Sequence, residues 1–291
     1  MSGRDPFDAE RPRLLGLAYR MLGSLADAED VVQDAWIRWQ RTDRDAVDNP
    51  AAWLTTATTR LALDRIRTLA RRREDYVGPW LPEPVALVAD DPAVATEQAE
   101  SLTLGFLVVL DALSATERAV FLLADVFGEP YSTIAAAVGK SEENCRQIAS
   151  RARRKVRSAR PPEVAPAGPD VLAALLAATA SGDIDAVLEL LDTDVVLVSD
   201  GGPDRKAARR PVVGASRVAR LLSNLASRAA AGGADLGVEI GSVNGEAVVV
   251  FGLPDGPLVA GADVADGRVV AVRILRNPAK LTHLVETVDL R

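Results

Sequence analysis

The stretch LSATERAVFLLADVFGEPYSTIAAAVGKSEENCRQIASRARRKVR, residues 113–157, decides the fold of the middle of the chain. Ser114 and Glu117 have the spacing of a capping box, which predicts that a helix begins here. A short second helix ends at Gly139, and Ser141 is a typical N-cap for a third. The stretch therefore predicts three helices joined by tight turns.

The third helix of this stretch is two-sided. Its apolar residues recur at helical spacing and form a packed stripe: Cys145, Ile148, Ala149, Ala152 and Val156. Its opposite face is polar and basic: Arg146, Gln147, Ser150, Arg151, Arg153 and Arg154. A short helix, a glycine turn and a capped basic helix are typical of a helix-turn-helix that reads DNA. The alternative is a solvated charged face on an ordinary helical hairpin. Cys145 is expected to be a core residue rather than a reactive thiol.

Upstream, residues 25–40 (LADAEDVVQDAWIRWQ) predict a second amphipathic helix. The buried side is expected to consist of Ala28, Val31, Val32, Ala35, Trp36 and Trp39. The opposite side presents Asp30, Gln33, Asp34 and Ile37. An apolar residue among acids indicates a partner surface, although a plain solvated face fits the pattern equally well.

A third helix is expected to begin at Asn49-Pro50, with asparagine as N-cap and proline as first residue. Arg60, Asp64 and Arg67 fall on one stripe, and Asp64 can pair with either arginine or with Arg65. This row favours contact with a nucleic-acid backbone. An arginine-laced surface helix is the alternative.

The net charge of −7 weighs against nucleic-acid binding only if the charge is uniform. It is segregated, since residues 60–73 hold six Arg against one Asp, and residues 140–160 hold eight Arg or Lys against two Glu. The chain has one cysteine, no membrane-spanning apolar run and no secretory leader, so a reducing cytoplasm is expected, with no disulfide, metal site or cofactor.

Proline-rich breaks divide the chain. YVGPWLPEPVALVADDP, from residue 76, separates two helical blocks, and ARPPEVAPAGPD at 159–170 precedes a change of pattern. Two short helices (about 170–191), a helix at about 215–230 and five strand-like runs follow. Asn244-Gly245 and Asp266-Gly267 predict hairpin turns, so the C-terminal third is expected to be α+β with an antiparallel sheet.

These segments together resemble the two domains of extracytoplasmic-function sigma factors. LLGLAYRMLGSLADAEDVVQDAWIRW looks like the first part of sigma region 2, and NPAAWLTTATTRLALDRIRTLARRR looks like the part that melts and reads the −10 promoter element. Residues 113–157 look like region 4, which reads the −35 element. The resemblance implies two all-α sigma domains.

A linker motif narrows the resemblance. Trp80-Leu81-Pro82-Glu83-Pro84 is similar to the WLPEP motif of the SigJ-like sigma factors, whose C-terminal domain is a SnoaL-like α+β cone. That domain usually carries DGGGK-like and NPDKL-like motifs. Asn277-Pro278-Ala279-Lys280-Leu281 matches the second with one change, whereas Asp200-Gly201-Gly202 matches only the start of the first, before Pro203-Asp204.

The resemblance implies this organisation: region 2 at 6–75, a linker at 76–98, region 4 at 99–160, a linker at 161–170, and a SnoaL-like domain at 171–291. It also implies roles for residues. Asp30, Gln33, Asp34 and Ile37 would meet the clamp helices of core RNA polymerase. The residues expected at promoter DNA are Arg60, Asp64, Arg65 and Arg67 at −10, and Arg146, Gln147, Ser150, Arg151 and Arg154 at −35.

The C-terminal domain is expected to regulate the factor. The hypothesis is that Trp80, Leu81, Pro82, Glu83 and Pro84 contact Asp200 and the residues Asn277, Pro278, Lys280 and Leu281, so that the domain acts like a fused anti-sigma factor. The sequence leaves open whether the cone also binds a small-molecule ligand. Catalysis is the less favoured interpretation. His283, the lone histidine, is expected at a surface or an interface, and Asp200 and Asp263 are conceivable bases, but Asp200-Gly201-Gly202 is more typical of a turn. The alternative for the whole chain is a helix-turn-helix regulator fused to a small-molecule-binding or enzymatic domain.

Overall fold

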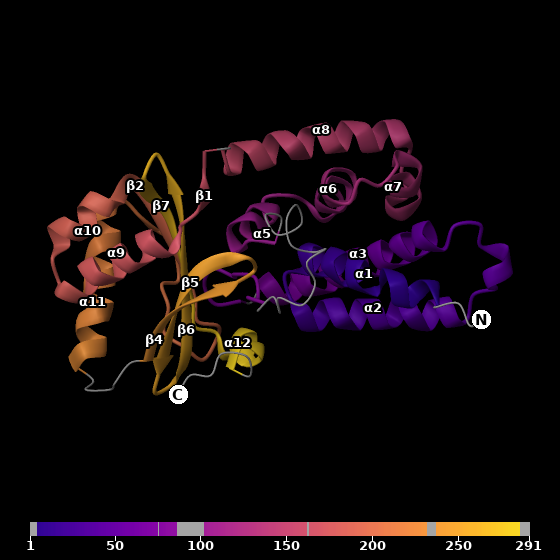
Figure 1. Ribbon diagram of the computed structural model, residues 1–291. Coiled ribbons are helices and arrows are strands. Elements are labelled where there is room, and N and C mark those ends of the chain that lie inside the picture. The colour runs from indigo at the N-terminus through magenta and orange to yellow at the C-terminus, as the bar shows by residue number, and fades with distance from the viewer. Residues whose placement is uncertain (1–4, 75, 86–101, 162, 232–236, 286–291) are drawn as a thin grey trace. The chain divides into compact units, whose positions relative to one another are not determined.

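The computed structural model describes residues 5–74, 76–85, 102–161, 163–231 and 237–285 (Figure 1). The chain divides into two compact units. Unit 1 holds the residues before 76 together with 107–160, and unit 2 holds 76–106 together with 161–291. Each unit therefore consists of two separate stretches of chain.

The first stretch of unit 1 is a helical bundle. Its helices are α1 (Pro6–Leu22), α2 (Leu25–Gln40) and α3 (Pro50–Glu74), with a 3-10 turn at Arg44–Ala46. Asp5 caps α1, whose end is set by Gly23 in the left-handed conformation (φ 69°). Asn49 accepts a hydrogen bond from the backbone N–H of Ala52 (3.0 Å), as expected of an N-cap. Trp39 and Trp53 pack at 5.3 Å between ring centroids and join α2 to α3.

The second stretch of unit 1 contains the helix-turn-helix. Its elements are α5 (Leu104–Leu110), which begins in unit 2, α6 (Ala115–Phe121), a π-helical turn (Leu122–Val126), α7 (Tyr131–Val138) and α8 (Glu142–Ala159). The predicted capping box is confirmed, because Ser114 and Glu117 exchange both hydrogen bonds. Gly139 ends α7 with φ 67°, and Ser141 caps α8. Cys145 is buried, as predicted, and burial raises the pKa of its thiol.

The two stretches of unit 1 pack against each other through buried arginines. Arg118 donates hydrogen bonds to the carbonyls of Met21 (2.9 Å) and Leu110 (3.1 Å). The guanidinium of Arg20 lies 5.4 Å from the ring centroid of Phe127, and burial lowers the pKa of Arg20 to about 10. Arg118 therefore connects α1 to the helix-turn-helix stretch by hydrogen bonds, and Arg20 packs against the ring of Phe127.

Unit 2 is built on a curved sheet with strand order β3-β2-β7-β6-β5-β4, to which β1 adds beside β6. The strands are β1 (Ala165–Pro166), β2 (Leu191–Asp200), β3 (Val212–Val213), β4 (Gly237–Val243), β5 (Glu246–Leu253), β6 (Gly256–Ala265) and β7 (Arg268–Leu275). The helices are α9 (Pro169–Ser181), α10 (Ile184–Leu190), α11 (Ala215–Ala231) and α12 (Pro278–Val285).

The predicted hairpins are confirmed. Asn244 (φ 54°) and Gly245 (φ 75°) join β4 to β5, and Asp266 (φ 48°) and Gly267 (φ 74°) join β6 to β7. The expected antiparallel sheet is found for the other strand pairs of the described residues, but β2 pairs with β7 in parallel, so the sheet is mixed. These two strands are far apart in the sequence, and no hairpin fixes their relative direction.

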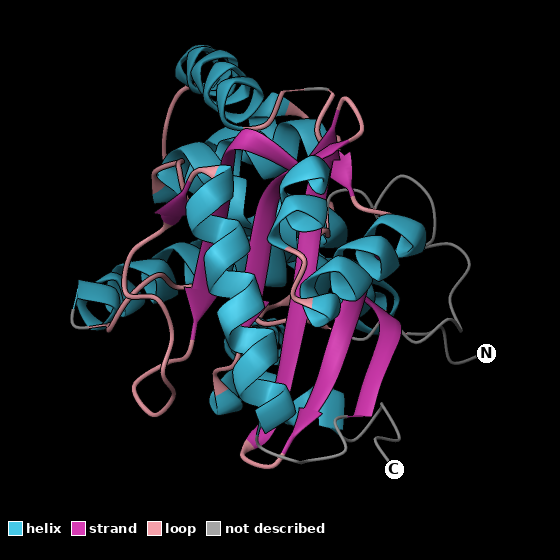
Figure 2. Cartoon of the chain, turned by 90° about the vertical axis from the view of Figure 1, so that its left-hand side faces the viewer, coloured by secondary structure: helices cyan, strands magenta, loops and turns pink. Residues whose placement is uncertain are grey.

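One face of the sheet carries the core of unit 2. Helices α9, α10 and α11 cover this face (Figure 1), and Figure 2 looks onto it. The core combines helix residues such as Leu172, Val187 and Val218 with strand residues such as Leu197 and Val272. The linker stretch 76–85 and α12 lie on the other face, where the site described below is built.

Candidate functional site

The face of α2 expected to meet the polymerase is largely open to solvent. Asp30, Gln33 and Asp34 are exposed, and Ile37 is half-buried. Trp36 was expected on the buried side, and this is wrong, because its side chain is 38% exposed. The buried stripe is centred on Ala35 and its helical neighbours, and Trp36 lies on the edge of that stripe. The exposed surface of α2 thus includes a large aromatic residue beside the acids.

The α3 row is engaged within unit 1. Arg67 pairs with Asp64 (2.6 Å), and both side chains are exposed. Arg60 donates from Nη2 to the carbonyl of Ala136 on α7 (2.6 Å). Arg65 turns toward α2, where hydrogen bonding to Asp27 (2.5 Å) raises its pKa. The predicted row therefore does not present a uniform face to solvent.

Helix α8 keeps its predicted two faces. Cys145, Ile148, Ala149 and Ala152 are buried. The residues expected at DNA are all exposed: Arg146, Gln147, Ser150, Arg151 and Arg154. Arg146 pairs with Glu142 (2.8 Å) and lies over the ring of Tyr131. Exposed pairs of this kind contribute roughly 1 kcal/mol or less, so the guanidinium can exchange its partner for a phosphate at low cost.

The linker and the C-terminal motifs meet at one buried carboxylate in unit 2. Asp200 is 1% exposed and accepts hydrogen bonds from the hydroxyl of Tyr76 (2.5 Å) and from the N–H groups of Leu81 (2.9 Å) and Gly202 (2.9 Å). Lys280 supplies the compensating charge, with Nζ 2.7 Å from Oδ2 of Asp200. We call the group formed by Tyr76, Trp80, Leu81, Asp200, Asn277 and Lys280 the linker clamp.

The ammonium group of Lys280 has further partners besides Asp200. Its Nζ also donates to the carbonyl of Leu81 (2.5 Å) and lies 3.9 Å from the ring centroid of Trp80. Asn277 donates from Nδ2 to the hydroxyl of Tyr76 (2.8 Å). Burial, together with the neighbouring Asp200 carboxylate, raises the pKa of Tyr76 well above its ordinary value, so the phenol remains a donor.

The remaining motif residues lie around the clamp. Pro278 begins α12, Leu281 is buried on that helix, and Pro82, Glu83 and Pro84 are buried in the linker. Pro203 and Asp204, where the motif departs from its family pattern, are exposed. The departure thus falls outside the buried part of the contact.

Glycine is required at Gly202, so Gly202→Ala is expected to loosen the clamp. Its φ is 62°, and an added Cβ would lie 2.7 Å from the side chain of Asn277. The left-handed conformation alone costs about 1–2 kcal/mol for alanine. Gly182→Ala is the matched control, because Gly182 has φ 73° but nothing within 4 Å of the added carbon. Urea unfolding should show a larger loss of stability for Gly202→Ala, and equal losses would contradict a steric role of Asn277.

Asn244 binds two points of the chain between regions 2 and 4, Val85 and Leu102, which sequence reasoning missed. It is fully buried, and its Oδ1 accepts from the N–H of Val85 (2.8 Å) while its Nδ2 donates to the carbonyl of Leu102 (2.9 Å). The Asn-Gly pair was interpreted only as a hairpin turn. Nothing in the local pattern distinguishes an asparagine that forms a turn from one that also binds a distant segment.

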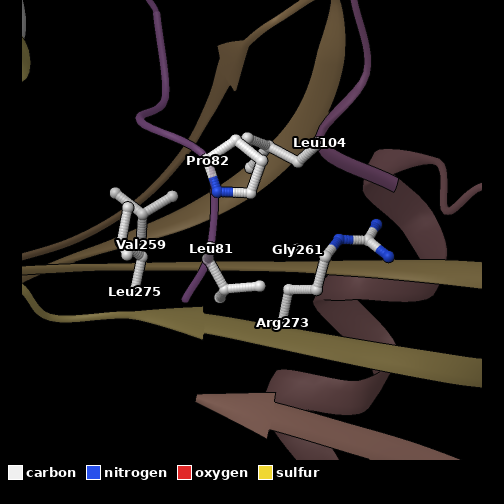
Figure 3. A pocket seen from close by; sticks show the side chains of 7 residues that line it. All are labelled: Leu81, Pro82, Leu104, Val259, Gly261, Arg273 and Leu275. Atoms are coloured by element: carbon white, nitrogen blue, oxygen red, sulfur yellow. The ribbon is translucent and has the colours of Figure 1, made fainter. Parts of the chain in front are cut away.

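The interior of unit 2 holds a buried charge cluster, of which only Asp263 was singled out in the sequence. Arg273 forms a bidentate pair with Asp263 (2.7 and 2.9 Å), and its Nη2 lies 3.8 Å from Oε1 of Glu246. Figure 3 shows Leu81 and Pro82 of the linker close to Arg273, which β7 carries. The cavity between them measures about 10 Å³, which is room for about one water.

Membrane spans and metal sites are absent from the described ranges. In the part of the chain that the structure describes, no helix is long and apolar enough to cross a bilayer, and no group of three or more His, Cys, Asp or Glu side chains is placed to hold a metal ion. The side chain of His283 lies outside the described part of the chain.

Comparisons with known proteins agree with this architecture. Residues 7–72 match the Sigma-70 region 2 family and residues 105–156 match Sigma-70, region 4. The ECF RNA polymerase sigma factor SigJ of Mycobacterium tuberculosis (strain ATCC 25618 / H37Rv) is 41% identical over 95% of this chain and 92% of its own length. A SigI factor from the same strain is 38% identical over 75% of this chain and 76% of its own.

A solved structure extends the match to the C-terminal domain. The crystal structure of the Mycobacterium tuberculosis extracytoplasmic function sigma factor SigJ superposes with a TM-score of 0.78 at 38% identity, covering 95% of this chain and 97% of that one. The helical regions, the linker and the mixed sheet therefore occur together in a known factor. The chain belongs to the SigJ-like subgroup of the extracytoplasmic-function RNA polymerase sigma factors, which bind core polymerase and direct promoter-specific transcription initiation.

Proposed function

We propose that the C-terminal domain regulates this sigma factor by holding the linker between regions 2 and 4. The observation that carries the proposal is the linker clamp, in which Asp200 and Lys280 bind the linker at Tyr76, Trp80 and Leu81. Residues 76–106, which include the linker between regions 2 and 4, belong to the same compact unit as the C-terminal domain. A fixed linker limits the separations that the two regions can adopt.

The packing within unit 1 supports a closed resting state. Arg60, expected at the −10 strand, donates to the α7 carbonyl of Ala136, and Arg13 of α1 pairs with Glu129 before α7 (2.8 Å). A region 4 seated on α3 occupies part of the surface proposed for the promoter strand. Binding of core polymerase would favour the open state by differential affinity for it.

We assign the individual interfaces as follows. Asp30, Gln33, Asp34 and Ile37 of α2 would meet the clamp helices of the polymerase, and the exposed Trp36 adds apolar area to that surface. The α8 residues Arg146, Gln147, Ser150, Arg151 and Arg154 would lie in the major groove at −35. Arg60, Asp64, Arg65 and Arg67 would approach the −10 strand once region 4 has left α3. The protein would act in the cytoplasm, where bacterial transcription takes place.

A ligand of the cone would compete with the linker. Leu81 and Pro82 line the cavity beside Arg273, and the space left holds about one water, 10 Å³. A larger molecule could enter only if these side chains left, and its binding would release the linker. We assign the cluster of Glu246, Asp263 and Arg273 to structure rather than catalysis, since the Asp263 carboxylate is bound bidentately by Arg273.

Trp80→Ala tests the proposal. Loss of the indole over Lys280 removes a contact of about 0.5–2 kcal/mol. A restraint weakened by 1–2 kcal/mol shifts a two-state equilibrium by roughly 5–30-fold. We expect promoter-specific transcription by the variant with core polymerase to rise several-fold in vitro, with helical content by circular dichroism unchanged. Affinity for core polymerase should rise as well, because core binds the open state more tightly.

The matched control is Val77→Ala in the same linker, because Val77 is 49% exposed and lies outside the clamp. It should transcribe like the unmodified protein. Equal transcription by the Trp80 and Val77 variants would refute regulation through the clamp. If neither variant nor the unmodified protein bound core polymerase, the chain would instead be a helix-turn-helix regulator acting alone.

A further inference from the structure

A third basic segment lies in the C-terminal domain. Six of the twelve Arg and Lys residues between 161 and 291 fall within residues 205–220, and this segment contains no acid. The rest of the domain is acidic, in keeping with the net charge of −7 of the whole chain. This local charge belongs neither to the linker clamp nor to the reading helices α3 and α8.

Five of these cations are open to solvent: Lys206, Arg209, Arg210, Arg217 and Arg220. Within the ranges that the structure describes, none of the five forms an ion pair, whereas exposed arginines elsewhere pair with acids, as Arg146 does with Glu142 (2.8 Å). An unpaired exposed guanidinium keeps its donors available for an anionic partner. We call these five residues the basic edge.

The fold fixes the segment that carries the basic edge. The N–H of Ala208 donates to Oγ of Ser199 on β2 (2.8 Å), and Arg205, the sixth cation, pairs with Asp255 (3.3 Å). Arg209 and Arg210 lead into β3, which lies at the edge of the sheet. These bonds hold the loop in place. Of the five cations, Arg220 donates from Nε to the carbonyl of Ser216 (2.9 Å), which leaves its two terminal nitrogens for a partner.

Helix α11 adds to the positive potential. It begins at Ala215, so its first N–H groups and the positive end of its dipole lie in the same segment. Arg217 and Arg220 are three residues apart in its first turns and therefore lie on one side of the helix. The loop before β3 and the start of α11 thus contribute cations along one continuous stretch of the sequence.

We propose that the basic edge binds the phosphate backbone of duplex DNA, as a contact of the sigma factor additional to regions 2 and 4. Guanidinium groups match the geometry of phosphate oxygens, and five exposed cations without acids between them suit a repeating polyanion. Such a contact reads no base sequence and adds affinity to any promoter. A small anionic metabolite fits less well, because the cations are spread along an exposed edge.

The test uses the full-length factor bound to core polymerase and the variant R209Q/R210Q/R217Q/R220Q. Binding to a promoter duplex is measured by fluorescence anisotropy over a range of salt concentrations. We expect affinity to fall roughly tenfold or more, and the slope of log K against log salt to decrease by about 0.9 for each phosphate that the variant no longer neutralises. Affinity for core polymerase, titrated without DNA, should be unchanged.

Two controls accompany the test. The charge-preserving variant R209K/R210K/R217K/R220K should retain most of the affinity and the salt slope. Arg228→Gln, at an exposed position near the far end of α11, should leave both unchanged. A thermal melt checks folding of each variant, and the two-site variant R209Q/R210Q with half the expected effect replaces the fourfold one if the latter unfolds.

Unchanged DNA affinity and salt slope in the glutamine variant would overturn the proposal. A loss of core affinity with normal DNA binding by the assembled holoenzyme would also overturn it and identify the basic edge as a polymerase surface. This result would leave the proposal on the linker clamp untouched, because that proposal is tested by transcription with Trp80→Ala, in which the basic edge is intact.

Discussion

Lys280→Met is expected to destabilise unit 2 by about 3–5 kcal/mol, the typical cost of leaving one partner of a buried ion pair uncompensated. Asp200 is 1% exposed, and Lys280 is the cation beside its carboxylate, at 2.7 Å. The substitution also removes the donor to the carbonyl of Leu81 and the cation over Trp80. Hydrogen exchange at the N–H of Leu81, which donates to Asp200, would report the loss directly.

Two further variants test whether the loss of stability comes from the buried ion pair. The double variant Asp200→Asn, Lys280→Met removes both charges and should recover much of the missing stability, since the stranded carboxylate is gone. Arg67→Met breaks an ion pair of similar length, 2.6 Å, whose side chains are about 70% exposed, and should cost less than about 1 kcal/mol. If the Lys280 and Arg67 variants were equally destabilised, the clamp would not depend on the buried pair.

Arg273→Met is expected to be at least as damaging, because it leaves two buried carboxylates without their cation. Asp263 loses a bidentate partner, and Glu246, 3% exposed, loses the positive charge 3.8 Å away. The expected loss is about 3–5 kcal/mol or more. Thermal unfolding measures it, and Arg268→Met is the control, since Arg268 donates to the backbone carbonyls of Glu189 and Leu191 and forms no ion pair with the residues that the structure describes.

Arg273→Met should also loosen the two chain segments that connect unit 2 to region 4, one before region 4 and one after it. An added carbon at Gly105 would lie 2.8 Å from Oδ2 of Asp263, so this residue packs directly on the pair. After region 4 in the sequence, β1 pairs with β6 at Pro166 and Asp263, and the N–H of Ala167 donates to the carbonyl of Ala262 (2.8 Å). Faster hydrogen exchange at Ala167 is therefore expected, and unchanged exchange there would contradict this link.

Much of the fold follows from local signals. The capping box at Ser114 and Glu117 and the Asn244-Gly245 turn depend on residues close in sequence, and the structure contains both. The parallel pairing of β2 with β7 was missed, because no local residue pattern encodes the relative direction of distant strands. Short strands such as β3, Val212–Val213, also carry too few residues to show a period.

The residues of the candidate site were also predictable only in part. The residues of the WLPEP and NPAKL segments were predictable from motifs, but Tyr76 and Asn244 were not, since their partners lie 124 and 142 residues away along the chain. Arg65 was expected at DNA from the family resemblance, and its pairing with Asp27 of α2 depends on how two helices meet. Spacing places a side chain on a face, and packing decides what that face contacts.

The clamp has a consequence for synthesis on the ribosome. The linker stretch that includes Leu81 is made early, whereas Lys280, which binds its carbonyl, comes 199 residues later. At about 5–20 residues per second, translation of that interval takes on the order of 10–40 seconds. During this time regions 2 and 4 have emerged while the lysine of the clamp does not yet exist. A newly made factor therefore passes through a stage without the clamp, and the proposed regulation through the clamp can act only on the finished chain.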